Sequence, residues 1–211
     1  MAIKTFMSVA LVLAAALGAG TVKSAPILPF YDSGDLTPRW HHVDHTIADF
    51  SLVTQTGEPI GRDDLIGRVH VATFIYTRCA NVCPAMVTQL KRVTNAIADR
   101  DEASIVAFTV TPQSDTPETL AGFGSERNLD PRTWRLVTGD PETIYQLART
   151  SYFADDGRLD AATPATEQFL HTEKALLVDR EGKLRGVYNA TLPNEIDKLI
   201  ADLGLLLPTA R

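Results

Sequence analysis

The residues best able to do chemistry in this sequence are two cysteines that lie four positions apart. Cys79 and Cys83 are the only cysteines among the 211 residues, and they stand in the stretch TFIYTRCANVCP. A structural disulfide between them would close a very short loop, and in the chain-entropy model a cross-link stabilises less as its loop shortens. The spacing therefore favours a functional pair, either a reversible disulfide or two sulfur ligands for one metal ion.

The position of the pair relative to the surrounding elements predicts its reactivity. Residues 69–76 (VHVATFIY) have the β-branched, apolar character of a buried strand, and Pro84 suits the first turn of a helix. Cys79 is then expected in the connecting loop and Cys83 at or next to the helix N-cap. The helix dipole and the neighbouring Arg78 would favour a thiolate there. Both sulfurs are expected at one exposed edge.

Two thiolates make an incomplete metal site, and histidine is the usual supplier of a third ligand. His41, His42 and His45 stand in a segment rich in Pro, Gly and aromatic residues, where a solvated loop cluster is favoured over an accessory metal site. His70 falls inside the apolar strand, at the end away from the cysteines, and is interpreted as a packed or an edge residue. His171 follows an irregular stretch and directly precedes a late strand, so a loop could carry it over the edge of the sheet.

Strands and helices alternate along the chain and end in a hairpin and a helix. This order predicts an α/β fold, a thioredoxin-like three-layer sandwich with a central mixed sheet. Met86 falls on the apolar face of its helix and is expected in the core, and Asp115 is interpreted as a helix cap. The expected elements are strands near 50–53, 69–76, 104–110 and 134–137, helices over 84–100, from 115–118, from 140–142 and over 194–207, and a hairpin over 174–189 turning near 181–182.

Composition, charge and the N-terminal apolar run indicate an exported protein with one folded domain. A hydrophobic content of 45% over this length supports one domain, and a net charge of −6 with scattered basic residues argues against nucleic-acid binding. The apolar run at residues 5–22 predicts that residues 1–25 are a signal peptide or a membrane anchor. Residues 26–45 are expected to form an extended linker, and residues 46–208 the folded domain. Export to the bacterial periplasm, or to the outer face of the cytoplasmic membrane, follows.

TFIYTRCANVCP is followed by FTVTPQSDTPETL and, much later, by FLHTEKALLVDREGKL. With these stretches, residues 46–205 show a resemblance to the Sco/SenC family of thioredoxin-fold copper chaperones. It implies one copper ion, Cu(I) or Cu(II), bound by Cys79, Cys83 and His171, and a copper-accepting subunit of cytochrome c oxidase or another cuproenzyme as partner. The sequence departs from the family's common pattern at Thr111, where an aspartate is usual, and at Ala80, where a proline is frequent.

A second function class fits the same pair of cysteines. A thiol-disulfide oxidoreductase could use Cys79 and Cys83 to reduce the cysteines of a partner protein, and it would not need His171. The spacing favours it less, because thioredoxin-type enzymes use two cysteines separated by two residues. A peroxidase is favoured less still. The protein is accordingly expected to be a metallochaperone rather than an enzyme.

Overall fold

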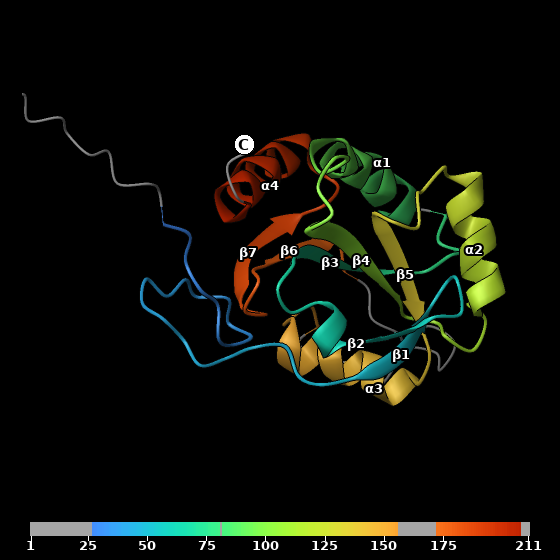
Figure 1. Cartoon of the computed structure of the whole chain (residues 1–211), viewed down its shortest axis with the longest axis horizontal. Helices are drawn as coiled ribbons and strands as arrows, with labels where there is room; N and C mark the ends of the chain where they lie inside the picture. Colours follow the sequence, from blue (N-terminus) through green and yellow to red (C-terminus); the bar gives the residue numbers. More distant parts are fainter. Residues whose placement is uncertain (1–26, 81, 156–171, 208–211) are drawn as a thin grey trace, which may run out of the picture.

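A mixed sheet of seven strands forms the centre of the molecule (Figure 1). This computed structural model describes residues 27–80, 82–155 and 172–207. The spatial order of the strands is β2-β1-β5-β4-β3-β6-β7, with β3, β4 and β5 parallel and the remaining pairs antiparallel. The strands are β1 (Ser51–Thr54), β2 (Pro59–Gly61), β3 (Val69–Ile75), β4 (Ala103–Thr109), β5 (Trp134–Thr138), β6 (Lys174–Val178) and β7 (Leu184–Asn189).

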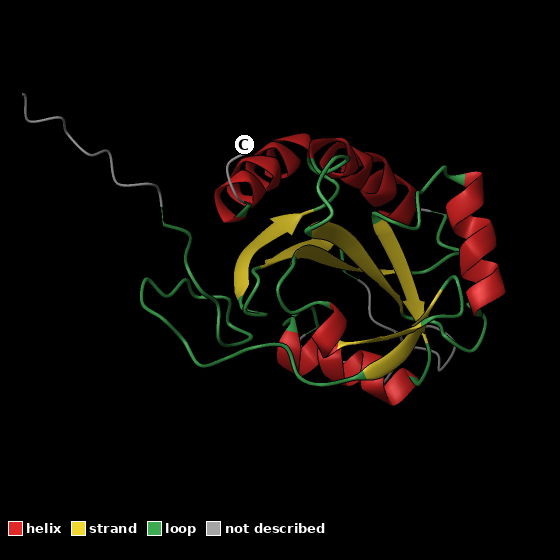
Figure 2. Ribbon diagram, in the orientation of Figure 1, coloured by secondary structure: helices red, strands yellow, loops and turns green. Residues whose placement is uncertain are grey.

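Helices cover both faces of this sheet (Figure 2). One apolar cluster, which includes Met86, Leu90 and Trp134, joins the sheet to α1, α2 and α4, and the expected core position of Met86 is confirmed. The other, which includes Phe74 and Phe108, lies toward α3. The predicted three-layer α/β sandwich is therefore confirmed. The helices are α1 (Val82–Ala96), α2 (Pro117–Glu126), α3 (Pro141–Gln146) and α4 (Pro193–Leu206), with a 3-10 turn at Arg62–Asp64 and a π-turn at Leu147–Ser151.

The two central strands, β3 and β4, lie in the interior of the fold. Every residue of β3 and of β4 is buried, because helices cover both faces of the sheet at these positions. Strands buried on both faces have nearly continuous apolar sequences rather than alternating ones. The parallel pairing of β3 with β4 also places the carboxyl ends of both strands, Ile75 and Thr109, at the same edge of the sheet.

Local signals determine most element boundaries. Thr116 caps α2 by accepting a hydrogen bond from the Thr119 amide, and Asp140 caps α3 in the same way. Asp115 was predicted to be the helix cap, and this is wrong, because its neighbour Thr116 provides the cap. Helix α1 begins at Val82, two residues before the predicted start at Pro84.

The hairpin of β6 and β7 turns where the sequence predicted. Gly182 has a φ of +77° in this turn, a conformation that favours glycine. A Cβ atom at this position would lie 2.7 Å from the Thr46 hydroxyl oxygen, so the turn also allows a close approach of the chain before β1. The hairpin is therefore fixed both by its own backbone and by packing against a distant segment.

The described part of the predicted linker, from residue 27, packs along β7. The Arg185 guanidinium donates hydrogen bonds to the carbonyl oxygens of Leu28 and Pro29, and the Lys183 ammonium donates to the Val43 carbonyl oxygen at 2.7 Å. Trp40 is 69% exposed in this segment. Among the described residues, no helix is both long and apolar enough to cross a bilayer.

Candidate metal centre

The two cysteines lie together at the junction between β3 and α1, as the sequence predicted. Cys79 is in the connecting loop, where its backbone amide donates to the Tyr76 carbonyl oxygen at 3.1 Å. Cys83 lies in the first turn of α1, and its backbone amide points at the Cys79 sulfur, 3.4 Å away. The first amides of a helix have no partner within the helix, so the Cys79 sulfur satisfies one of them. Both cysteines are thiols in the structure.

The predicted exposure and ionisation of the pair need correction at Cys83. Cys79 is half-buried, but Cys83 is only 6% exposed. Burial raises the pKa of the Cys83 thiol to about 12, and the adjacent Cys79 also raises it, whereas a backbone hydrogen bond at Tyr76 lowers it. Desolvation therefore outweighs the helix terminus, and Cys83 is protonated at neutral pH. A cation that binds to the pair would supply the positive charge needed to release this proton.

A buried carboxylate lies directly behind the cysteine loop, and sequence reasoning missed its role. Asp115 has no solvent-exposed surface, and it accepts hydrogen bonds from the hydroxyl groups of Thr77, Thr109 and Thr111. Thr77 is two residues before Cys79. A signal was present in the sequence, since Thr77 and Thr109 follow or end two adjacent apolar strands and Asp115 comes shortly afterwards. Only the parallel pairing of these strands shows that the four side chains meet.

The third predicted ligand, His171, lies outside the described residues. The described chain resumes at Thr172 and enters β6 at Lys174. Because β6 runs antiparallel to β3, its first residue lies at the carboxyl end of β3, the edge that also carries the cysteine loop. The Thr73 hydroxyl donates to the Lys174 carbonyl oxygen at 3.1 Å and ties these two strands together there. The fold thus returns the chain to the cysteine edge within three residues of position 171.

The structure places none of the other four histidines with the cysteine pair. His42 is exposed and lies 3.8 Å from the Glu181 carboxylate, while His45 contacts the Ser151 carbonyl oxygen at 3.0 Å. His70 is fully buried, as predicted, and its Nε2 lies 3.2 Å from the Tyr152 hydroxyl oxygen. His41 is exposed. Within the ranges that the structure describes, no group of three or more His, Cys, Asp or Glu side chains is arranged to hold a metal ion.

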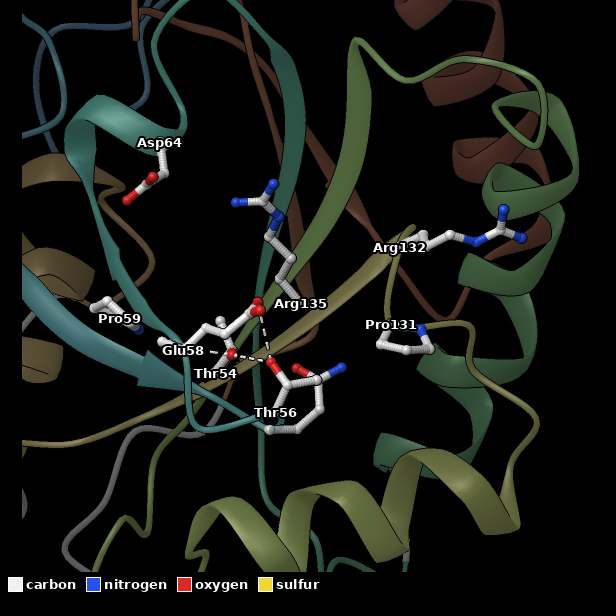
Figure 3. Close-up of a pocket in the computed structure, with 9 residues that line it drawn as sticks. Thr54, Thr56, Glu58, Pro59, Asp64, Pro131, Arg132 and Arg135 are labelled. Carbon is white, nitrogen blue, oxygen red and sulfur yellow. Dashed lines mark hydrogen bonds between the residues drawn. The ribbon is translucent and has the colours of Figure 1, made fainter.

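A polar hollow lies between β1, β2 and the start of β5 (Figure 3). Arg135 lines it together with Glu58 and Asp64. Burial lowers the pKa of the Arg135 guanidinium, and the two carboxylates act in the opposite direction. Arg135 is near the amino end of β5, whereas the cysteines follow the carboxyl end of the parallel strand β3. The hollow therefore lies at the opposite edge of the sheet and contributes nothing to the cysteine site.

Comparisons with known proteins identify a consistent set of relatives. The SCO1/SenC family model matches residues 40–206. The crystal structure of a SCO1/SenC family lipoprotein from Bacillus anthracis has a TM-score of 0.68 at 28% identity, covering 78% of this chain and 96% of that one. BsSco, described as a Sco family cytochrome c oxidase assembly protein with a disulfide switch, has a TM-score of 0.64 at 25% identity, covering 78% and 94%. Copper-bound ScoI of Bradyrhizobium japonicum has a TM-score of 0.61 at 28% identity, covering 77% and 99%.

Proposed function

Because this chain belongs to the SCO1/SenC family, we propose that it is a copper-binding metallochaperone of the bacterial cell envelope. Cys79, Cys83 and His171 hold one copper ion, which is the cargo. The recipient is the binuclear copper site of cytochrome c oxidase or of a related cuproenzyme. The observation that carries the proposal is the pairing of the two cysteines, with the Cys79 sulfur 3.4 Å from the Cys83 amide nitrogen.

The donor atoms suit copper better than harder metals. Two thiolates favour soft Cu(I), and an added imidazole gives a donor set that also accepts Cu(II). The burial of Cys83 adds a requirement, because its raised pKa keeps the thiol protonated at neutral pH and a bound cation must displace this proton. Binding of copper is therefore expected to release protons. The copper-bound Bradyrhizobium relative supports the same choice of metal.

The topology supports His171 as the third ligand. The start of β6 lies at the carboxyl end of β3, next to the loop that carries Cys79. An imidazole provided from just before this strand needs to bridge only a short stretch of chain. The other histidines offer no such geometry, since His45 and His70 are held by contacts on other parts of the fold.

The leader and the relatives support this location and this recipient. Residues 5–22 serve either as a cleaved signal or as a membrane tether, and both deliver the domain to the periplasm or to the outer face of the cytoplasmic membrane. The Bacillus anthracis relative is described as a lipoprotein, and BsSco as a cytochrome c oxidase assembly protein. Both descriptions support an envelope protein that meets a membrane-bound cuproenzyme.

A thiol-disulfide oxidoreductase is the second candidate, and the unequal burial of the two thiols favours it. Cys79 is accessible to a partner disulfide, while Cys83 is positioned next to it to resolve a mixed disulfide. Such an enzyme would transfer two electrons and two protons from its dithiol to the partner. The domain of residues 46–208 would be the same in both cases, and His171 would not be required.

One pair of variants tests the metal site. The reduced, detergent-purified chain receives one equivalent of Cu(II), and its visible and electron paramagnetic resonance spectra are recorded. We expect an intense thiolate-to-copper charge-transfer band in the wild type that is lost or shifted in His171→Ala. The control is His42→Ala, which removes an exposed histidine from the N-terminal segment and should leave the spectrum unchanged.

The opposite result has a defined chemistry. Two Cu(II) ions can each accept one electron from the cysteine pair, giving two Cu(I), one disulfide and two protons. If the wild type shows no charge-transfer band and its thiol content falls in this ratio, the chaperone proposal is refuted and the oxidoreductase is favoured. Cys79→Ser and Cys83→Ser then test whether reduction of a model disulfide requires both sulfurs.

A further inference from the structure

The carboxylate of Asp115 is the centre of a buried polar network behind the cysteine loop. Its Oδ1 accepts from the Thr77 hydroxyl at 2.5 Å, and its Oδ2 accepts from the hydroxyls of Thr109 at 2.5 Å and Thr111 at 3.0 Å. The Thr77 backbone amide also donates to Oδ2, at 3.4 Å. The cap of α2 belongs to Thr116, so these contacts are not part of helix capping.

The burial of this carboxylate needs an explanation. Asp115 is completely enclosed, and among the described residues no lysine or arginine forms an ion pair with it. A buried carboxylate is costly unless hydrogen bonds replace its hydration, and hydrogen bonds to an ionised acceptor are stronger than those between neutral groups. The three threonines therefore have a strong preference for the positions in which they reach the carboxylate.

Among these donors, Thr77 alone belongs to the cysteine loop. Thr109 ends β4, and Thr111 lies just beyond it. The two hydrogen bonds from Thr77 therefore attach the first half of the loop to a fixed point, two residues before Cys79. The second half is attached through Cys83, which lies in the first turn of α1. Together these attachments hold the Cys79 sulfur beside the Cys83 amide.

We propose that Asp115, acting through Thr77, is the positioning residue of the cysteine pair. It keeps the Cys79 sulfur next to Cys83 before a metal ion binds or a disulfide forms. A pre-positioned pair has a high effective concentration of one sulfur at the other, which favours both a disulfide and the joint binding of one ion. The inference deepens the proposed function, because it concerns the same two sulfurs.

Two isosteric variants separate positioning from general stability. Thr77→Val removes the hydroxyl that connects Asp115 to the cysteine loop, and Thr111→Val removes a hydroxyl from the same carboxylate outside the loop. The full chain is equilibrated in glutathione buffers and its dithiol fraction is measured. Two thiols give two electrons and two protons to one oxidised glutathione, which becomes two reduced glutathione molecules.

The expected result is a change in redox equilibrium that is confined to the loop contact. Thr77→Val should lower the ratio of disulfide to dithiol about three- to tenfold, the equivalent of one hydrogen bond. Thr111→Val should stay within about twofold of the wild type although it loses a similar hydrogen bond. Thr77→Ser, which keeps the hydroxyl, should restore the wild-type ratio. Urea unfolding of the same proteins shows that both valine variants are folded.

Equal shifts in the two valine variants, or no shift in either, would overturn the inference and leave the network a purely structural one. The glutathione equilibrium does not involve copper. A shift in Thr77→Val without copper binding by the wild type would therefore refute the proposed function and leave the positioning role intact. Copper binding by the wild type without this shift would refute the positioning role alone.

Discussion

Replacing His70 with Gln should make the protein less sensitive to mild acid. His70 lies near the start of β3, is fully buried, and has its Nε2 3.2 Å from the Tyr152 hydroxyl oxygen. Burial, with a smaller contribution from the positive charge of Arg135, lowers the pKa of His70 from 6.5 to about 3. The amide of Gln can contact the same hydroxyl and does not titrate, so the substitution removes the titration and keeps the partner.

The magnitude follows from the two pKa values. Well above pH 6.5 the imidazole is neutral in both the folded and the unfolded chain, so it adds no pH dependence. Below that pH the unfolded chain takes up a proton that the folded chain does not, and the free energy of unfolding falls by about 1.4 kcal/mol per pH unit. The loss continues as far as the folded-state pKa. Between pH 7 and pH 5, His70 should therefore remove about 2 kcal/mol from the free energy of unfolding.

Urea unfolding at pH 7 and pH 5, followed by tryptophan fluorescence, measures this difference. The wild type and the control His42→Gln, which changes an exposed histidine, both keep His70. Both should therefore lose the about 2 kcal/mol of unfolding free energy that its titration removes. His70→Gln should lose about 2 kcal/mol less than either between the two pH values. An identical loss in all three proteins would mean that His70 is protonated in the folded state near its ordinary pKa, and the assignment of a buried neutral imidazole would be refuted.

Three further predictions address other parts of the molecule. At pH 8, iodoacetamide should alkylate Cys83 at least about tenfold more slowly than Cys79, because Cys83 is buried and protonated. Cys83 is measured in Cys79→Ser and Cys79 in Cys83→Ser, and equal rates would contradict the prediction. Acrylamide should quench the fluorescence of Trp40, which is 69% exposed, so Trp40→Phe should leave emission from the buried second tryptophan that acrylamide hardly quenches. Gly182→Ala should lower the free energy of unfolding, measured in urea, by about 1–3 kcal/mol, while Gly204→Ala on the exposed side of α4 should raise it by about 0.5–1 kcal/mol. No change in Gly182→Ala would show that the turn tolerates a side chain.

The elements that the sequence predicted well depend on neighbouring residues. The continuous apolar stretches became β3 and β4, and the hairpin turned at Gly182, because hydrophobic pattern and turn chemistry act over a few positions. The same holds for the meeting of Cys79 and Cys83, which are four residues apart at the start of a helix. The error at the start of α1 was two residues, the usual uncertainty of a helix end.

Long-range packing produced the features in which the structure differs from the sequence predictions. Thr77 and Asp115 are 38 residues apart, and they meet only because β3 and β4 pair in parallel with their carboxyl ends together. The burial of Cys83 has the same origin, since the sheet and its neighbours cover the face of α1 that carries Cys83 and Met86, while Pro84 and Ala85 in the same turn stay exposed. The expected thiolate considered only the helix terminus and Arg78, and it omitted the cost of desolvation.

The sequence by itself determined the order of elements, the pairing of the two cysteines and the family to which the chain belongs. These properties are encoded in patterns that are local or that recur at recognisable positions. The tertiary structure alone decided how deeply each sulfur is buried, which carboxylate supports their loop, and that β6 begins at the same edge of the sheet. Electrostatic free energies depend on distance and on exclusion of water in three dimensions, and neither is a function of separation along the chain.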